Sequence, residues 1–317
     1  MAIAPTTAWL TDPDYDEPHR RAEILVAAFM QTLAGMWAAR LEAFDERDGL
    51  DAARVAEEGE VAAAHLLGTV LRSLDYLPPV ELEFGDVLDA VLTADKRLNP
   101  DDRLDYRGTL RASFAGFGIT RPAHQILDVD GLAAPAHPSR RPGTRAGDAF
   151  PEDPDAGTGS PGIHYQHLNH AAMQTSPEEV FAFLWNNAAS LGIDLRLSTR
   201  VDRVLATTRV GPDGLVVDEV LADYTQWIRT TSDDLPRGLR KPRGMPAGAK
   251  VEMWGGGVLV FDQFGRFRLH QRKPITDVDR QGRRLRYLHQ HGLRDSRGGY
   301  GASDGVDADE RFALLHP

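Results

Sequence analysis

Residues 11–44 read TDPDYDEPHRRAEILVAAFMQTLAGMWAARLEAF, a short acidic turn followed by a long apolar segment. Pro18 suits the first turn of a helix, because the backbone N–H that proline lacks would have no partner there. The acidic residues just before it suit the positive end of the helix dipole. Behind the turn, apolar residues recur at helical spacing as far as Trp37. The stretch therefore predicts a long, mostly buried amphipathic helix with His19 in its first turn.

Asp14 precedes His19 closely enough for its carboxylate to reach the imidazole ring. A carboxylate in that position would fix the tautomer of the ring and stabilise its protonated form. A histidine held in this way can stabilise a developing oxyanion. Asp14 and His19 are therefore the candidate catalytic residues. The alternative is that Asp14 only caps the helix and that His19 is a solvated residue of the first turn.

Three further helical segments are predicted before residue 119. The first runs through residues 55–74 and stops before a pair of prolines, which cannot continue a helix. The second covers 85–98, with an acidic start and a basic end. The third is expected to begin with Asn99 as its cap and to end near Gly116. Residues 1–119 are thus predicted to form one helical domain.

The order of these features carries a resemblance. Asp14, His19 and the long helix are followed at residues 65–119 by HLLGTVLRSLDYLPPVELEFGDVLDAVLTADKRLNPDDRLDYRGTLRASFAGFGI. This order resembles the all-helical C-terminal half of thermolysin-like (gluzincin) zinc metallopeptidases, over the first 119 of 317 residues. The resemblance implies that His19, oriented by Asp14, faces a catalytic zinc across a cleft and hydrogen-bonds the oxygen of the tetrahedral intermediate.

Two features depart from the family. Residues 20–23, RRAE, replace the small and amide residues that the family places after this histidine, which leaves the substrate contacts open. No HExxH motif occurs anywhere in the chain, although this motif supplies two zinc ligands and the general base of such enzymes. The resemblance therefore implies a truncated, split or domain-shuffled relative that is inactive as a lone chain. It would bind zinc only with a complementary HExxH lobe as its partner, so no cofactor is expected in the chain itself.

Composition limits the other function classes. The chain has 317 residues, 42% hydrophobic and 26% charged, which is enough for a real core and about two domains. A formal net charge of -11 argues against a nucleic-acid partner for the protein as a whole. Cysteine is absent, so disulfides, thiolate metal sites and a cysteine nucleophile are excluded. The chain start lacks the pattern of a secretory signal, and its apolar segments carry charges, so we expect no membrane contact and a cytoplasmic location.

Residues 120–163 are rich in Pro, Gly, Asp and Ala and hold few large apolar residues. Such a stretch cannot bury enough surface to offset its ordering entropy, so it predicts a flexible linker that protease should cut first, between Arg140 and Gly162. His164, His167 and His170 follow at helical spacing. No carboxylate stands at a matching interval, and we expect no metal there.

Residues 164–317 predict an α+β domain, which makes the whole chain α+β. Ser176 opens a helix as its cap and Gly192 ends it. The period then changes to two in LRLSTRVDRVLATTRV and LVVDEVLADYTQWI, and again in KVEMWGGGVLVF and RFRLHQRKPI, which predicts two antiparallel hairpins. The glycines at 255–257 indicate a bulge or bend rather than a phosphate loop. A short helix is expected at 283–293.

The last region also gathers many basic side chains, which are Arg237, Arg240, Lys241, Arg243, Arg266, Arg268, Arg272, Lys273, Arg280, Arg283, Arg284 and Arg286. Three interpretations stay open at this point. The basic residues could be a solvated surface, a face for a phosphate-bearing partner, or a surface that docks onto the acidic first domain. The second function class follows from them: a non-catalytic protein-interaction module that uses the basic sheet domain.

Overall fold

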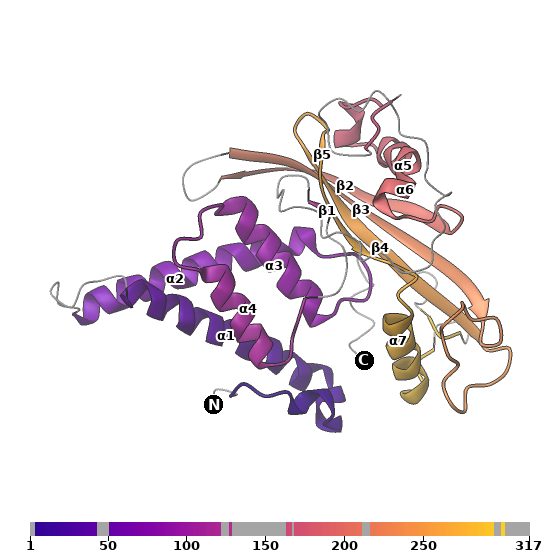
Figure 1. The fold of residues 1–317 in the computed structure, drawn as a ribbon, viewed down its shortest axis with the longest axis horizontal. Coiled ribbons are helices and arrows are strands. Elements are labelled where there is room, and N and C mark those ends of the chain that lie inside the picture. Colours follow the sequence, from indigo (N-terminus) through magenta and orange to yellow (C-terminus); the bar gives the residue numbers. More distant parts are fainter. Residues whose placement is uncertain are drawn as a thin grey trace, which may run out of the picture.

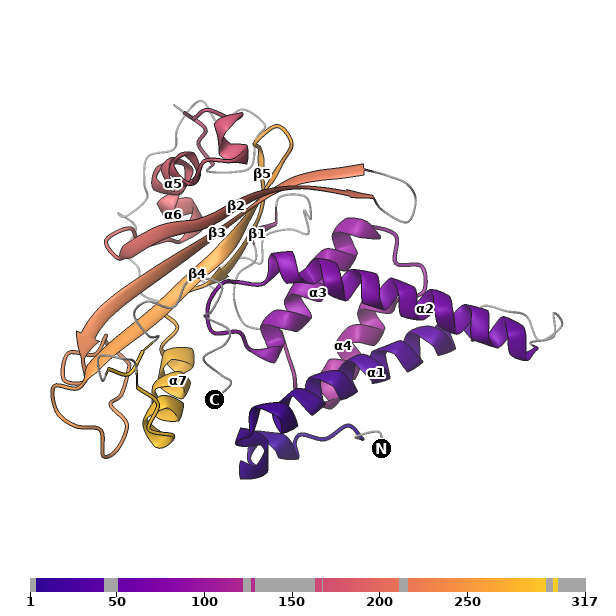
Figure 2. The same ribbon diagram turned by 180° about the vertical axis from the view of Figure 1, so that it is seen from behind.

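The protein is α+β, as predicted (Figure 1). A computed structural model describes residues 4–42, 51–121, 127–128, 163–166, 168–210, 216–294 and 299–301. Helices α1 to α4 gather at one end of the molecule, and α1 and α2 extend away from the sheet (Figures 1 and 2). A five-stranded antiparallel sheet with α5, α6 and α7 makes the other end.

The helical region begins as the sequence predicts. The short 3-10 turn η2 (Pro13–Asp16) leads into α1 (Pro18–Glu42), which α2 (Ala52–Ser73) follows. The carboxylate of Glu17 accepts the backbone N–H of His19 at 3.0 Å and that of Arg20 at 2.7 Å, which satisfies the free end of α1. These bonds from Arg20 and His19 also lower the pKa of Glu17. A buried cluster then joins α1 to α3 (Phe84–Leu98) and α4 (Tyr106–Gly116).

The predicted start of the fourth helix at Asn99 is wrong. Helix α4 begins at Tyr106, and its cap is Asp105, whose backbone lies in the left-handed region at φ 51°. The carboxylate of Asp102 accepts the N–H groups of Tyr106 and Arg107, at 2.7 Å and 3.0 Å. Two later aspartates thus take over the capping that we assigned to Asn99, and one of them, Asp102, also forms an ion pair with Arg107.

The sheet has the strand order β1-β5-β4-β3-β2, and all its pairs are antiparallel. Its strands are β1 (Leu127–Asp128), β2 (Ser198–Val210), β3 (Val216–Thr231), β4 (Lys250–Asp262) and β5 (Phe267–Lys273). Both predicted hairpins are confirmed, as β2 with β3 and β4 with β5. Strand β4 is buried along almost its whole length, because helices cover both faces of the sheet.

The glycines of β4 form no bulge against β3, one of the two possibilities that the sequence indicated. Their pairing with β3 continues through Gly255, Gly256 and Gly257 without a change of register, and the irregularity with β5 lies later, at Val260. A Cβ on Gly255 would lie 2.6 Å from the backbone nitrogen of Ile275. The glycines therefore permit close approach of neighbouring backbone rather than a turn.

The predicted helix from Ser176 to Gly192 is broken once. Its cap is confirmed, since Ser176 accepts the N–H of Glu179, but α5 (Pro177–Asn186) ends at Asn187 and α6 (Ala188–Leu191) follows. The side chain of Asn187 bonds the backbone of His164 in both directions and also donates to the carbonyl of Phe183 in α5. The late helix is α7 (Val278–Gln290), which begins earlier than predicted.

The helical region and the sheet share a core. Tyr76, Ala90 and Ala94 from the helices pack against Leu221, Val258, Val260 and Leu269 of the sheet. Most of the predicted linker, 120–163, lies outside the described residues, but Leu127 and Asp128 within it pair with β5. The division into two domains stays a prediction, while the described parts on either side are packed together.

Candidate functional site

Asp14 and His19 lie at the exposed start of α1, where sequence analysis placed them. His19 is exposed, and the side chain of Asp14 forms an ion pair with Arg20 at 3.7 Å. Asp16, in the same turn, lies 3.7 Å from Arg21 and 3.9 Å from the imidazole of His291 just beyond α7. The turn is therefore accessible from solvent and is approached by the C-terminal part of the chain.

Helices α1 and α2 carry a second apolar side that the sequence analysis did not identify. Their inner sides are buried, whereas their outer sides expose seven large apolar side chains by 36% to 60%. We call this the outer apolar face, and its members are Val26, Met30 and Trp37 on α1, Val61, Leu67 and Leu71 on α2, and Leu74 just after α2.

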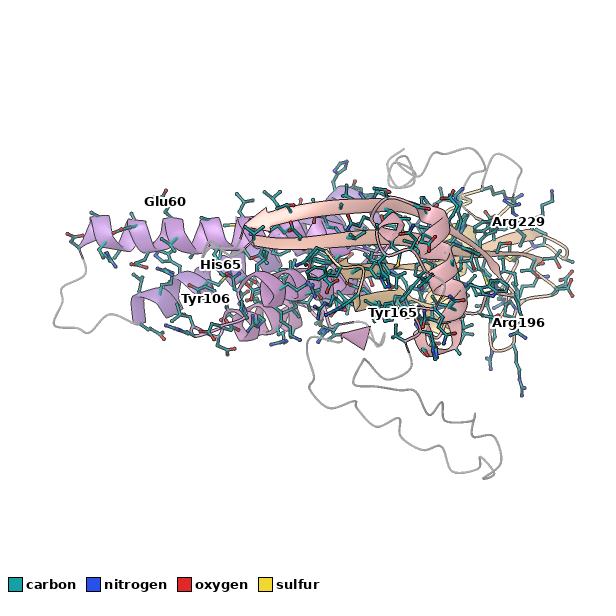
Figure 3. The ribbon with its side chains drawn as sticks, turned by 90° about the horizontal axis from the view of Figure 1, so that it is seen from above. Glu60, His65, Tyr106, Tyr165, Arg196 and Arg229 are labelled. Carbon is teal, nitrogen blue, oxygen red and sulfur yellow. The ribbon has the colours of Figure 1, made fainter. Side chains whose placement is uncertain are left out.

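Contacts between the helices bring the outer sides of α1 and α2 next to each other. The indole N–H of Trp37 donates to the carbonyl of Val55 at 2.9 Å, so α1 and α2 are neighbours. Helix α4 meets α1 where Thr109 touches Gly35, and α3 meets α2 through His65 and Asp95. Figure 3 shows the consequence on α2, where Glu60 points outward and His65 lies toward Tyr106.

His19 belongs to the same side of α1 as the outer apolar face. His19, Val26, Met30 and Trp37 are separated by seven, four and seven residues, which places them on one line of a helix. Contrary to the sequence expectation, α1 is long and apolar enough to cross a membrane by length and composition alone. Apolar residues on both sides of the helix explain this, because its inner side packs in the core.

A polar cluster around His65 connects three helices. His65 Nε2 lies 2.7 Å from one carboxylate oxygen of Asp95, and Arg107 donates to the other at 3.0 Å. The amide of Asn99 donates to Asp95 at 3.1 Å, and the Tyr106 ring meets the imidazole edge-on at 5.0 Å (Figure 3). A small cavity lies beside the cluster. The imidazole is directed at its carboxylate partner, so the cluster fixes α2, α3 and α4 relative to one another.

His164 and His170, after the predicted linker, do not lie on a helix. His167 falls outside the described residues. His164 bonds Asn187 through its backbone, and His170 packs against the ring of Tyr165 at 5.7 Å. Within the described ranges, no group of three or more histidine and acidic side chains is placed to hold a metal ion.

Several basic residues of the last region bind the helical region directly. Lys273 is fully buried, donates to Asp86 at 2.5 Å and also donates to the carbonyl of Glu81. Arg280 and Arg284 both contact the carboxylate of Glu81, whose backbone lies in the left-handed region at φ 44°. For these residues, docking within the chain is the correct one of the three interpretations.

One carboxylate of the sheet is strongly perturbed. Burial raises the pKa of Asp223 to about 6, although the guanidinium of Arg203, which donates to it at 2.8 Å, lowers it. The Oδ1 atom of Asp223 is buried without a hydrogen-bond partner among the described residues. Perturbed acids occur at functional sites and in structural ion pairs alike. Here Arg203 is half exposed, and the pair lies on the outer hairpin, away from Asp14 and His19.

The raised pKa makes the stability of the protein depend on pH. The folded state holds a proton on Asp223 that the unfolded state has released between about pH 4 and 6, so the free energy of unfolding falls as pH rises through this range. Asp223→Asn should therefore increase that free energy by about 1–3 kcal/mol at pH 7.5 and change it little at pH 4. Urea denaturation at both pH values measures this. Asp279→Asn, on the exposed side of α7, is the control, and an equal effect of both substitutions would contradict the assignment.

Comparison of the chain with protein-family models, with curated proteins and with solved structures gives no match.

Proposed function

We propose that this chain is the helical half of a divided thermolysin-like metallopeptidase, inactive alone and dependent on a complementary zinc-binding lobe. The observation that carries the proposal is the exposure of His19 and Asp14 at the start of α1. An imidazole that stabilises an oxyanion must face the reacting carbonyl, and in the lone chain it faces solvent. A second lobe that meets this end of α1 would supply the zinc, the activated water and the general base.

The chain's own contribution would be positioning and charge. With a partner in place, Asp14 would leave Arg20 and accept a hydrogen bond from the imidazole of His19, which would hold the ring toward the developing oxyanion. The ion pair of Asp14 with Arg20 is long and exposed, so little free energy opposes this exchange. No zinc ligand is assigned to this chain, and the sequence contains no HExxH motif.

The test uses the reading frame next to this one. The purified chain with added zinc should not hydrolyse casein. Co-expression with a neighbouring lobe that contains HExxH should produce zinc-dependent hydrolysis, and His19→Ala should lower the rate by about a hundred- to a thousandfold. His170→Ala, a histidine of the sheet region, is the matched control.

Two results would contradict the proposal in different ways. Zinc-dependent hydrolysis by the lone chain, abolished in His19→Ala, would show that no second lobe is needed. An absence of activity with every adjacent HExxH lobe, or of any such lobe, would remove the peptidase assignment.

The second candidate, an interaction module based on the basic sheet domain, has less support. Lys273, Arg280 and Arg284 are occupied by Glu81 and Asp86 of the same chain. They are therefore not free for an external phosphate or acidic partner. The exposed basic side chains that remain, among them Arg237, Arg240 and Arg243 in the connection between β3 and β4, would have to carry that function.

A further inference from the structure

The outer apolar face is larger than solvation alone explains. Its seven side chains expose roughly 700 Å² of surface, whereas the largest apolar patch on a typical monomer covers about 300–600 Å². Two acidic residues lie beside its apolar members, Glu23 before Val26 and Glu60 before Val61. A surface of this composition is typical of a protein interface.

The relief of the face suits packing against other helices. Ala34 and Ala64 are exposed beside the large residues, and a Cβ on Gly68 would meet no atom within 4 Å. Large side chains such as Met30 and Leu67 thus alternate with small residues that leave depressions in the surface. Helices that pack ridges into grooves, or knobs into holes, have surfaces of this kind. Two antiparallel helices with an apolar outer side form half of a four-helix bundle.

We propose that two copies of this chain associate through their outer apolar faces, so that the α1–α2 pair of each copy packs on that of the other. Two faces of roughly 700 Å² would bury about 1,400 Å² in total, within the 1,200–2,000 Å² of standard stable interfaces. A two-fold axis lets the same patch serve both copies, so the pair closes without leaving a second copy of this face exposed. Glu23 and Glu60 beside the face oppose the alternative of an anionic lipid surface.

The inference does not rest on the proposed peptidase function, but it has a consequence for it. His19 lies seven residues before Val26 on the same line of α1, or about 10 Å along the axis. A second copy seated on Met30 and Trp37 would reach this end of the helix. A complementary lobe that contacts His19 would therefore have to displace the second copy.

The test is sedimentation of the full-length chain over a range of micromolar concentrations. The parent protein should sediment with the mass of two chains. Met30→Glu and Leu71→Glu should each weaken the association by about a hundredfold or more, because a charge would be buried at the centre of the interface. Both side chains are exposed, so circular dichroism and melting temperature of the monomer should remain those of the parent. Trp185→Glu, equally exposed on α5, is the control and should leave the dimer intact.

Three results would overturn the proposal. The parent protein could sediment as a monomer throughout. The dimer could persist in Met30→Glu and Leu71→Glu, which would place the interface elsewhere. A monomer that co-sediments with phosphatidylcholine vesicles, and loses this binding in Met30→Glu, would assign the face to lipid instead.

Discussion

Lys273→Met should destabilise the protein by about 3–5 kcal/mol, because it leaves Asp86 charged and buried without its cation. The lysine is fully buried and Asp86 is only 2% exposed, and Nζ and Oδ2 lie 2.5 Å apart. The same carboxylate also accepts the backbone N–H of Glu83 at the start of α3, so it cannot turn toward water. The free energy of unfolding in urea measures the effect.

Two comparisons make this result specific. Arg283→Met removes the ion pair with Glu83, whose side chains are 56% and 41% exposed, and should cost less than about 1 kcal/mol. The double variant Lys273→Met with Asp86→Asn should recover part of the loss, since no charge is then left buried. If Lys273→Met is no more destabilising than Arg283→Met, the buried pair does not hold the two regions together.

Cleavage of the chain between Arg140 and Gly162 should leave two pieces that remain associated. Their shared core of Tyr76, Ala90 and Ala94 against the sheet, together with the buried pair of Lys273 and Asp86, would be exposed by separation. Each piece alone should therefore unfold or aggregate. A protease site inserted at residue 150, followed by size-exclusion chromatography, measures the association.

The cleavage experiment also decides the domain organisation. Co-elution of the pieces, lost in Lys273→Met, would show that the helices and the sheet form one cooperative unit. Two pieces that separate and each keep a sharp melting transition would instead support two independent domains joined by a linker.

Local signals predicted much of the fold. Pro18 and Ser176 mark helix starts because proline and a capping hydroxyl act on their own turn, and the period-two patterns predict both hairpins. The start of α4 was predicted wrongly because Asn99, Asp102 and Asp105 are all good caps, and the local sequence does not choose between them. Such a choice is made by tertiary packing.

The ion pairs between the helical region and the sheet, and the outer apolar face, were harder to predict. The partner of Lys273 lies 187 residues away, so the sequence could suggest docking without choosing it. In and just after α2, Leu67, Leu71 and Leu74 follow a helical period that is the usual signature of a buried side. A second apolar period on the same helix was the available signal.

The distance in sequence between Asp86 and Lys273 affects how the protein emerges from the ribosome. Asp86 in α3 and Glu81 in the preceding loop are synthesised 187 or more residues before their cations. At about 5–20 residues per second, the ribosome needs roughly 10–40 s to deliver Lys273. During that interval Glu81 and Asp86 lack the cations that bind them in the folded protein, and the side of the helices that packs on the sheet is uncovered. Chaperones that bind nascent chains should therefore engage residues 76–98 until strand β5 appears.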